Sequence, residues 1–301
     1  MHPFLEFLIM KNSVITIGTF DGVHKGHQAI LNKVVDVAKK GNLKSIVLSF
    51  ENPVKQVSGL ITTTEEKVNL LASFCVDEIL LLPVTKKMLS TTAEDFFETV
   101  LVKQLKAKHI VVGYDCTFGK DRKGTVAWLK KNVKKHGIKL TVINPVKVNN
   151  KIVSSSKIRD LITKNNIKDT NKMLNRIFSF TGKHVTGNKI GRTLGFPTIN
   201  IKVDKEKLLP KGVFACMVSD RKKNMYCGVL NIGIRPTVDL KEHKLSVEIH
   251  LLNFSGVWKE KYPNVYINKF IRKEQKFKTI ELLKKSIQKD IEITKKQFKI
   301  K

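Results

Sequence analysis

The spacing of apolar residues changes near residue 178, and this change constrains the fold more than any other feature of the sequence. Before it, short apolar runs alternate with stretches of helical periodicity. The runs expected to form buried strands are 14–17, 45–50, 78–82, 109–112 and 140–143, and the expected helices are 26–40, 65–74, 93–105, 125–136, 155–164 and 168–177. This alternation predicts βαβ units, and therefore an α/β fold with a parallel sheet covered on both faces.

After residue 178 the apolar runs follow one another without a long helix between them. The expected strands are 179–185, 213–219, 226–232, 245–253 and 264–271. Such a series predicts a small antiparallel β-barrel. The stretch 279–299 carries apolar residues on one helical face, which predicts a terminal helix packed on the barrel. Two domains are therefore expected, residues 1–177 and 178–301, and the length of 301 residues suits two.

The formal net charge of +30 raises the possibility of a nucleic-acid partner. Of the 56 basic residues only seven are Arg, and the Lys residues are spread along the whole chain. Nucleic-acid binders usually concentrate charge on one face and use Arg for paired contacts. The composition favours a solvated Lys-rich surface, which also suits small anionic substrates. No apolar run approaches the ~20 residues of a membrane span, so no membrane partner is expected. The four cysteines form no CxxC pair, which favours a cytoplasmic protein.

The first candidate site follows the first expected strand and opens the first helix, where ligands bind in parallel α/β sheets. A helix N-terminus there offers free N–H groups to a phosphate. His24 and His27 are three residues apart, so their imidazoles share one side of the first turn and can stabilise charge during group transfer. No third ligand lies nearby in the sequence, which argues against zinc. The other candidate phosphate-binding residues here are Gly18, Phe20, Asp21, Gly22 and Gly26.

These residues, as Gly-Thr-Phe-Asp-Gly-Val-His-Lys-Gly-His-Gln, resemble the adenylyltransferase half of the bacterial bifunctional riboflavin kinase/FAD synthetases. Two later segments, 112–119 and 153–159, are similar to further motifs of that family. The resemblance implies a Rossmann-like nucleotidyltransferase sheet, with Asp115 as a flavin or nucleotide contact. Hydroxyls at a helix start followed by an Arg one turn later form a triphosphate clamp. The candidates for this clamp are Ser155, Ser156 and Arg159.

The second candidate site lies in the β half, in the Gly-rich and basic segment 187–200. A flexible loop rich in backbone amides can wrap a nucleotide phosphate, and Gly191 and Arg192 are its candidate phosphate-binding residues. Thr198 and Asn200 are two residues apart, so in an extended chain their side chains point to one side. A hydroxyl and an amide oxygen there suit Mg²⁺ shared with phosphate oxygens. A glycine-rich hairpin without a ligand is the alternative.

The segment Gly-Arg-Thr-Leu-Gly-Phe-Pro-Thr-Ile-Asn at 191–200 resembles the riboflavin kinase signature of the same family. Segments 231–237, 247–252 and 271–277 are similar to three further kinase motifs. The resemblance implies that Thr198 and Asn200 bind Mg²⁺ and ATP phosphates, and that Glu248 accepts the proton of the riboflavin 5′-hydroxyl. It also implies flavin or nucleotide contacts at Asn231 and Arg235. Without the resemblance, Glu248 would be interpreted as an ordinary outward-facing strand residue.

The expected function is flavin cofactor synthesis in two steps, from riboflavin and ATP to FMN, and from FMN and a second ATP to FAD and pyrophosphate. Residues 257–260 depart from the kinase pattern, in which a second Asp, a Tyr and a second Gly are usual. A monofunctional FAD synthetase with an impaired kinase half is therefore an alternative. A nucleotidyltransferase for another phosphorylated acceptor and a basic nucleic-acid-binding protein are further alternatives. The sequence leaves the oligomeric state open.

Overall fold

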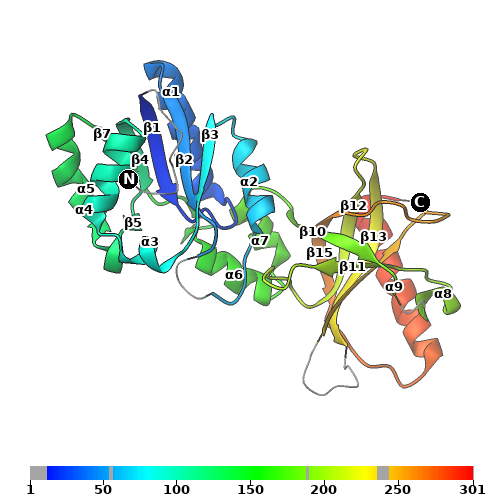
Figure 1. Cartoon of the computed structure of the whole chain (residues 1–301). Helices are drawn as coiled ribbons and strands as arrows, with labels where there is room; N and C mark the ends of the chain where they lie inside the picture. The colour runs from blue at the N-terminus through cyan, green and yellow to red at the C-terminus, as the bar shows by residue number, and fades with distance from the viewer. Residues whose placement is uncertain (1–11, 54–56, 188–189, 236–243, 301) are drawn as a thin grey trace. The chain divides into compact units, whose positions relative to one another are not determined.

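The computed structural model describes residues 12–53, 57–187, 190–235 and 244–300, without the side chains of residues 190, 234, 235 and 244. The chain divides after Ser155 into two compact units, and most of their helices and strands are labelled in Figure 1. The division falls at the first residue of a helix and does not coincide with the domain boundary expected at residue 177. That boundary therefore stays a prediction.

The first unit is built on a five-stranded parallel sheet in the order β3-β2-β1-β4-β7. The strands are β1 Ser13–Gly18, β2 Lys44–Phe50, β3 Glu78–Leu82, β4 Ala107–Gly113 and β7 Lys139–Ile143. All five agree with the strands expected from the apolar runs. Successive residues of β1 are buried against opposite faces: Val14 packs with Ile30 and Val34 of one helix, and Ile15 packs with Phe96 and Phe97 of another segment. The parallel α/β fold is therefore confirmed.

Helices cover this sheet, and shorter elements lie beside it. They are α1 Lys25–Gly41, α2 Thr64–Ala72, α3 Lys86–Ser90, α4 Ala93–Asp95, the π-helical η1 Phe96–Gln104, the 3₁₀ segments η2 Lys120–Arg122 and η3 Val133–His136, α5 Val126–Asn132, and the strand pairs β5 Thr117–Phe118 with β6 Gly124–Thr125 and β8 Lys147–Val148 with β9 Lys151–Ile152. The helix expected at 93–105 thus consists of a short α-helix that passes directly into a π-helix.

The order of the strands reverses between β1 and β4, and this reversal locates a ligand-binding edge. From β1 the chain moves outward to β2 and β3, then returns to β4 on the other side of β1. At such a switch point the carboxyl ends of the two central strands open a crevice. The connection that follows β4 contacts the end of β1 there, where the Cys116 thiol donates to the carbonyl of Ile17 at 3.9 Å.

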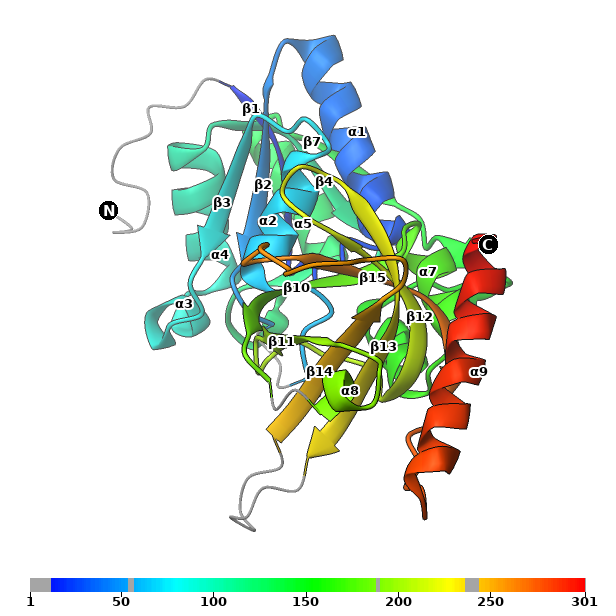
Figure 2. The same cartoon turned by 90° about the vertical axis from the view of Figure 1, so that its right-hand side faces the viewer.

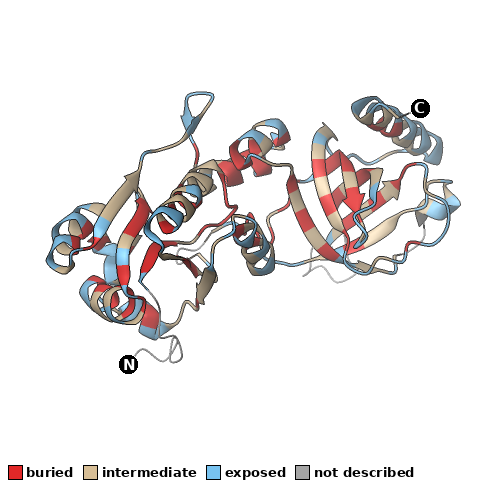
Figure 3. Ribbon diagram, turned by 90° about the horizontal axis from the view of Figure 1, so that it is seen from above, coloured by how far each residue is buried: buried red, intermediate tan, exposed pale blue. Residues whose placement is uncertain are grey.

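The second unit contains a closed six-stranded antiparallel barrel in the order β10-β11-β14-β13-β12-β15. The strands are β10 Phe178–Val185, β11 Ile199–Val203, β12 Gly212–Ser219, β13 Met225–Arg235, β14 Lys244–Leu251 and β15 Asn264–Arg272. Buried residues alternate with more exposed ones along strands such as β10 and β14 (Figure 3), because every second side chain points inward, whereas β12, against which α9 packs, is buried almost throughout. The unit also contains α6 Ser155–Thr163, apart from its first residue, and α7 Ile167–Leu174, α8 Ile190–Thr193 and α9 Ile280–Phe298.

The terminal helix α9 packs on the outside of the barrel against β12 and β13, as Figure 2 shows. Ile291 of α9 joins Val213 and Val229 of the barrel in one apolar cluster. Beside it, the Asp290 carboxylate accepts hydrogen bonds from Arg272 Nε at 3.0 Å and Nη2 at 2.8 Å. Burial raises the pKa of Asp290, and the Arg272 guanidinium opposes that rise. The expected terminal helix is confirmed.

The barrel contains one strand that the sequence pattern missed. β11 spans only five residues, and it pairs with Gly182–Val185 of β10 on one side and with two residues of β14 on the other. It was not expected because it follows a glycine-rich segment and has no continuous apolar run. Its pairing closes the barrel and places Thr198 and Asn200 beside β14.

Asp290→Asn should lower the free energy of unfolding of the second unit by about 3 kcal/mol, because the Arg272 guanidinium loses its carboxylate in a partly buried position. Urea denaturation followed by Trp258 fluorescence in a Trp128→Phe background measures the change in this unit. Asp160→Asn is the matched control, since its carboxylate binds Lys157 and Lys164 at the surface. An Asp290→Asn protein as stable as the Asp160→Asn protein would contradict the prediction.

Candidate active sites

The connection between β1 and α1 has an unusual backbone. Phe20, Gly22 and Val23 all have positive φ, at 52°, 83° and 36°. Such values are strained for residues with a side chain, most of all for a β-branched one. The turn closes through a hydrogen bond from Val23 N to the Phe20 carbonyl at 3.0 Å. A conformation of this kind persists only where surrounding contacts hold it.

Asp21 supplies those contacts. Its buried carboxylate accepts hydrogen bonds from the backbone N–H of Ile61 at 3.2 Å and of Thr62 at 3.0 Å, and from the Thr62 hydroxyl at 3.2 Å. The Thr62 hydroxyl in turn accepts from Gly22 N at 3.0 Å. The sequence assigned Asp21 to phosphate binding; in the structure its carboxylate ties the turn to residues 61–62. Thr62 was missed, because it lies 41 residues from Asp21 in the sequence and carries no local signal.

His24 and His27 meet at the start of α1, as their spacing predicted. His24 is the N-cap residue, and its Nδ1 accepts from His27 N at 3.4 Å. The two rings stack with centroids 3.6 Å apart and an angle of 15° between their planes. Because Nδ1 is an acceptor, the proton of a neutral His24 ring is on Nε2. The first turn of α1 contains no acidic residue, so no carboxylate there competes with an anion for the helix N-terminus.

Three of the other candidates in this segment shape the turn through packing. Phe20 is buried, and its ring meets His27 edge-on at 5.0 Å. A Cβ on Gly18 would lie 3.1 Å from the Phe20 ring, and a Cβ on Gly26 would lie 3.2 Å from the His24 ring. The glycines therefore leave room for the aromatic rings beside them.

Asp115 lies just after β4, at the switch-point edge of the sheet. Its side chain is exposed, and one of its carboxylate oxygens lies against Gly113. The next residue, Cys116, is largely buried, and burial raises the pKa of its thiol to about 12. Cys116 is therefore a packing residue rather than a thiolate at neutral pH.

The serine pair begins α6, and its two members have different surroundings. The Ser155 hydroxyl donates to the carbonyl of Asp21 at 2.9 Å, which links the start of α6 to the β1–α1 turn. Ser155 is the first residue of α6. Ser156 is exposed, whereas Arg159, one turn further along, is buried. Ser156 and Arg159 belong to the second unit.

In the second unit, strand register places three polar residues in one row. Glu248 of β14 stands opposite Asn200 of β11 on one side and Asn231 of β13 on the other. Directly opposite residues share a face of the sheet, so the three side chains all point outward from the barrel. Their neighbours Val247 and Ile249 are buried. The Glu248 carboxylate accepts from Thr198 Oγ1 at 3.4 Å and from Ser246 Oγ at 3.1 Å.

The glycine-rich segment forms a compact turn before β11. Gly191 accepts a hydrogen bond from Phe196 N at 2.8 Å, and a Cβ on Gly191 would lie 2.4 Å from the Phe196 carbonyl oxygen. Nδ1–H of His250 donates to the Pro197 carbonyl at 2.8 Å, which fastens the turn to β14. Arg192 is exposed on this turn. Asn200 lies against Gly187, where a Cβ would be 2.1 Å from its amide nitrogen.

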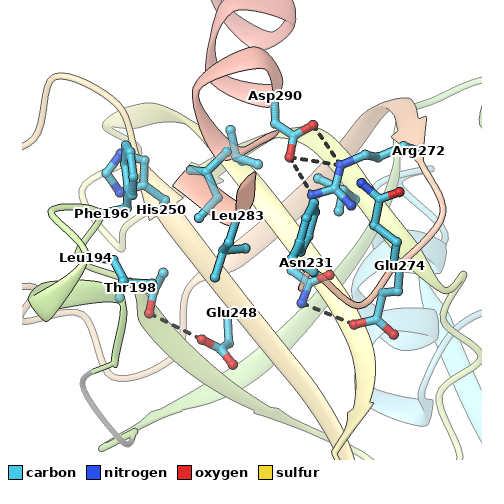
Figure 4. Close-up of a pocket in the computed structure, with 16 residues that line it drawn as sticks. Leu194, Phe196, Thr198, Asn231, Glu248, His250, Arg272, Glu274, Leu283 and Asp290 are labelled. Atoms are coloured by element: carbon cyan, nitrogen blue, oxygen red, sulfur yellow. Dashed lines mark hydrogen bonds and ion pairs between the residues drawn. The ribbon is translucent and has the colours of Figure 1, made fainter. Parts of the chain in front are cut away.

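A pocket of about 390 Å³ opens between this face of the barrel and α9. Figure 4 shows Thr198, Asn231 and Glu248 on one side of it and Leu283 of α9 opposite. The residues that line it are Gly191, Leu194, Phe196, Thr198, Val213, Val229, Asn231, Glu248, His250, Arg272, Glu274, Gln275, Phe277, Leu283, Ile287 and Asp290. The pocket thus joins a polar edge to an apolar wall, the usual composition of a small-molecule site.

Several lining residues were missed by sequence reasoning. Glu274 accepts from Asn231 Nδ2 at 3.3 Å, and it occupies space that only a glycine at position 233 leaves open. Arg272 lies with its guanidinium carbon 5.6 Å from the centre of the Phe277 ring. The signals available were the charged run at 272–277 and the similarity of segment 271–277 to a kinase motif, and neither assigned a contact to a single residue. The side chain of Arg235 lies outside the described part of the chain, so its expected contact stays a prediction.

The loop that departs from the kinase pattern is an anchored turn. Trp258 is buried against Tyr226 at 5.2 Å and Phe254 at 5.7 Å. The Glu260 carboxylate accepts from Tyr262 N at 2.8 Å and from Arg221 N at 3.1 Å, and these bonds lower its pKa. Among the described residues, none from 253–260 lines the pocket. The altered residues therefore shape a turn away from the pocket wall.

The chemistry of the donors at the polar edge suits Mg²⁺. Thr198, Asn200 and Glu248 bring a hydroxyl, an amide and a carboxylate to one face, and oxygen is the ligand that Mg²⁺ prefers. Within the described ranges, no cluster of three or more His, Cys, Asp and Glu side chains could hold a metal by itself. An ion here would share its coordination with phosphate oxygens.

Gly22→Ala should destabilise the first unit more than Gly137→Ala does. Both glycines have positive φ, 83° and 62°, so both substitutions carry a backbone cost of about 1 kcal/mol. Only at Gly22 would the new Cβ also meet a neighbour, Ile61 Cγ2 at 2.9 Å, whereas nothing lies within 4 Å at Gly137. Thermal unfolding of the two variants measures the difference. Equal losses would show that the Gly22 turn is not packed as described.

Two family models match the chain and together cover most of it. One, described as FAD synthetase, matches residues 8–157. The other, described as riboflavin kinase, matches residues 174–298. The first match contains the β1–α1 turn, Asp115 and the serine pair but ends before Arg159, and the second contains the barrel pocket. Among the described residues, no helix is both long and apolar enough to span a membrane.

Similar proteins span both parts of the chain. A bifunctional riboflavin kinase/FMN adenylyltransferase of Buchnera aphidicola subsp. Schizaphis graminum is 37% identical over 97% of this chain and 96% of its own length. The protein of that name from Escherichia coli K12 is 33% identical over 96% and 93%. A crystal structure of a Streptococcus pneumoniae protein, titled macrolide-efflux protein, matches with a TM-score of 0.86 and 29% identity over 96% and 95%. The chain belongs to the bifunctional riboflavin kinase/FMN adenylyltransferase family, with a FAD synthetase domain followed by a riboflavin kinase domain.

Proposed function

We propose that this chain makes FAD from riboflavin in two steps, with the residues assigned below. The riboflavin 5′-hydroxyl attacks the γ-phosphate of ATP and yields FMN and ADP. The FMN phosphate then attacks the α-phosphate of a second ATP and yields FAD and pyrophosphate. The observation that carries the proposal is the row of Asn200, Glu248 and Asn231 beside an apolar pocket, in the part of the chain that matches riboflavin kinase.

In the kinase domain, Glu248 would accept the proton of the 5′-hydroxyl as that oxygen attacks phosphorus. The hydroxyls of Thr198 and Ser246 donate to the two oxygens of this carboxylate and so orient it. The apolar wall at Phe277 and Leu283 would take the flavin ring, since a planar aromatic system gains from burial there. Asn231 has a buried Oδ1 with no partner in the part of the chain described, which leaves it to accept from the flavin.

Thr198 and Asn200 would hold Mg²⁺ together with oxygens of ATP. Bound Mg²⁺ would supply charge neutralisation for the γ-phosphate. Gly191 and Arg192 would bind the ATP phosphates, the first through its backbone amide and the second through its exposed guanidinium. Arg235 would contact flavin or nucleotide at the end of β13.

In the adenylyltransferase domain, the start of α1 would bind the ATP phosphates. FMN already carries an anionic phosphate, so the attack needs no base. Catalysis there would consist of positioning and of charge stabilisation by His24, His27 and the hydroxyls and guanidinium of α6. The backbone of the β1–α1 turn would bind phosphate, and the residues that hold this backbone in place are Gly18, Phe20, Asp21, Gly22 and Gly26. Asp115 would contact flavin or nucleotide at the switch-point edge.

Three wider assignments accompany this proposal. A domain boundary near residue 177 is supported by the riboflavin kinase match from residue 174 and by the start of β10 at Phe178. Riboflavin, FMN, FAD and ATP are the proposed ligands, with neither nucleic acid nor membrane as partner. A cytoplasmic location is proposed because both steps consume ATP.

The test is ATP-dependent conversion followed by chromatography, with riboflavin and FMN supplied separately and Mg²⁺ present. Both FMN and FAD are expected from riboflavin, and FAD from FMN. FAD from FMN alone would instead support a chain with an impaired kinase domain. Neither product from either flavin would overturn the proposal.

His27→Ala should reduce FAD formation by about 100-fold or more, while FMN accumulates from riboflavin. The imidazole is lost from the charge-stabilising site, which commonly costs this much in kcat. His136→Ala is the control in the same domain, since that imidazole binds Glu98 away from α1. If His27→Ala stopped FMN formation in a folded protein, the two reactions would be assigned to the wrong domains.

Glu248→Gln should block riboflavin phosphorylation by about 100-fold or more and leave FMN adenylylation unchanged. The amide keeps the shape of the side chain but has no basic oxygen to accept a proton. Product formation from riboflavin and from FMN separates the two effects. Glu281→Gln, at the exposed start of α9, is the matched control. A Glu248→Gln enzyme that phosphorylates riboflavin at the normal rate would remove Glu248 from the mechanism.

A further inference from the structure

Lys67 is a lysine in an unusual place. It lies in the first half of α2, and only 2% of it is exposed to solvent. Lysine is almost never fully buried in proteins. The location near the positive N-terminal end of a helix is also unfavourable for a cation. A residue that costs this much to bury needs compensating contacts.

The contacts of Lys67 are at the carboxyl end of β2. Its ammonium donates to the carbonyl of Phe50, the last residue of β2, and to the carbonyl of Glu51 at 3.0 Å. The Thr64 hydroxyl donates to the same Glu51 carbonyl at 3.2 Å. Lys67 therefore fixes the point at which the chain leaves β2.

The same helix is joined to the β1–α1 turn. α2 begins at a capping box, in which Thr63 and Glu66 exchange hydrogen bonds. Directly before that cap lie Ile61 and Thr62, whose backbone N–H groups hold the Asp21 carboxylate. Ser49, near the end of β2, donates to the carbonyl of Thr19 at 3.3 Å. The end of β2, the start of α2 and the β1–α1 turn thus form one hydrogen-bonded assembly.

We propose that Lys67 is a positioning residue of the adenylyltransferase reaction. Its ammonium holds the end of β2 and the start of α2 in register, so that Asp21 keeps the β1–α1 turn in the form that stacks His24 on His27. The inference rests on the proposed function. Lys67 acts through backbone groups and need not touch a substrate.

The charges around Lys67 add a pH dependence. Burial lowers its pKa to about 8, and the charges of Asp21 on the β1–α1 turn and Glu51 after β2 oppose that shift. On its own helix, Glu65 and Glu66 lie in the first turn. In the unfolded chain a lysine keeps its proton up to about pH 10. As pH rises above 8, the folded protein therefore loses this ammonium while the unfolded chain would retain it.

The experiment compares Lys67→Met, an unbranched side chain one atom shorter and without the charge, with Lys67→Arg, whose guanidinium stays charged at all accessible pH values. With FMN and ATP as substrates, Lys67→Met should lower kcat by about 10- to 100-fold and change either KM by less than about threefold, because the histidines are misplaced and the substrates still bind. The wild-type kcat for FAD formation should fall above pH 8, and this decline should be absent in Lys67→Arg.

Two controls keep the outcome interpretable. Lys40→Met removes an exposed lysine of the same domain, which pairs only with Asp36 at the surface among the contacts described, and should leave kcat unchanged. Riboflavin phosphorylation by the same chain should show no decline above pH 8. If Lys67→Met fails to fold, the wild-type and Lys67→Arg pH profiles decide.

Wild-type kcat in Lys67→Met, or an alkaline decline that persists in Lys67→Arg or is absent from the wild type, would overturn the inference. A wild-type chain that forms no FAD from FMN would instead overturn the proposed function.

Discussion

The adenylyltransferase domain depends on the contact between the Asp21 carboxylate and the backbone of residues 61–62. Two residues with side chains, Phe20 and Val23, are held at positive φ beside it, at a cost of about 1–3 kcal/mol each. Three hydrogen bonds to one buried carboxylate contribute about 1.5–3 kcal/mol each, which is enough to hold both residues. The strain is therefore stored at the start of α1, where His24 caps the helix.

The kinase domain depends instead on strand register. Val247 and Ile249 must point into the barrel, and this requirement places Glu248 outside, opposite Asn200 and Asn231. A slip of one residue would turn Glu248 into the core and the apolar side chains outward. Apolar packing inside the barrel thus decides where the polar row lies outside it. The Arg272–Asp290 pair then sets α9 over that row as the opposite wall of the pocket.

Patterns within short stretches of the sequence predicted the features that depend on residues close together in the chain. The five parallel strands follow from apolar runs, and the His24–His27 contact follows from a spacing of three at a helix start. Glu248 was assigned only by resemblance, because one strand shows which residues share a face and not what covers it. The contacts of Glu274 and Asp290 could be recognised only in the closed barrel with α9 packed on it. Lys67 carried a signal that was overlooked: it lies four residues before the buried Leu71, hence on the same face of α2.

The net charge of +30 and the buried groups contribute to the two reactions in different ways. Exposed lysines raise the local concentration of ATP and FMN, but at physiological salt their influence extends only about 8 Å. They attract every anion alike and therefore select none. Riboflavin is uncharged, so in the proposed kinase site its recognition would come from the apolar wall and the polar row beside the pocket. FMN and ATP are both anions, so the adenylyltransferase domain must separate them by geometry. In the proposed site that requirement would fall on the turn that Asp21 holds, where several buried polar contacts meet.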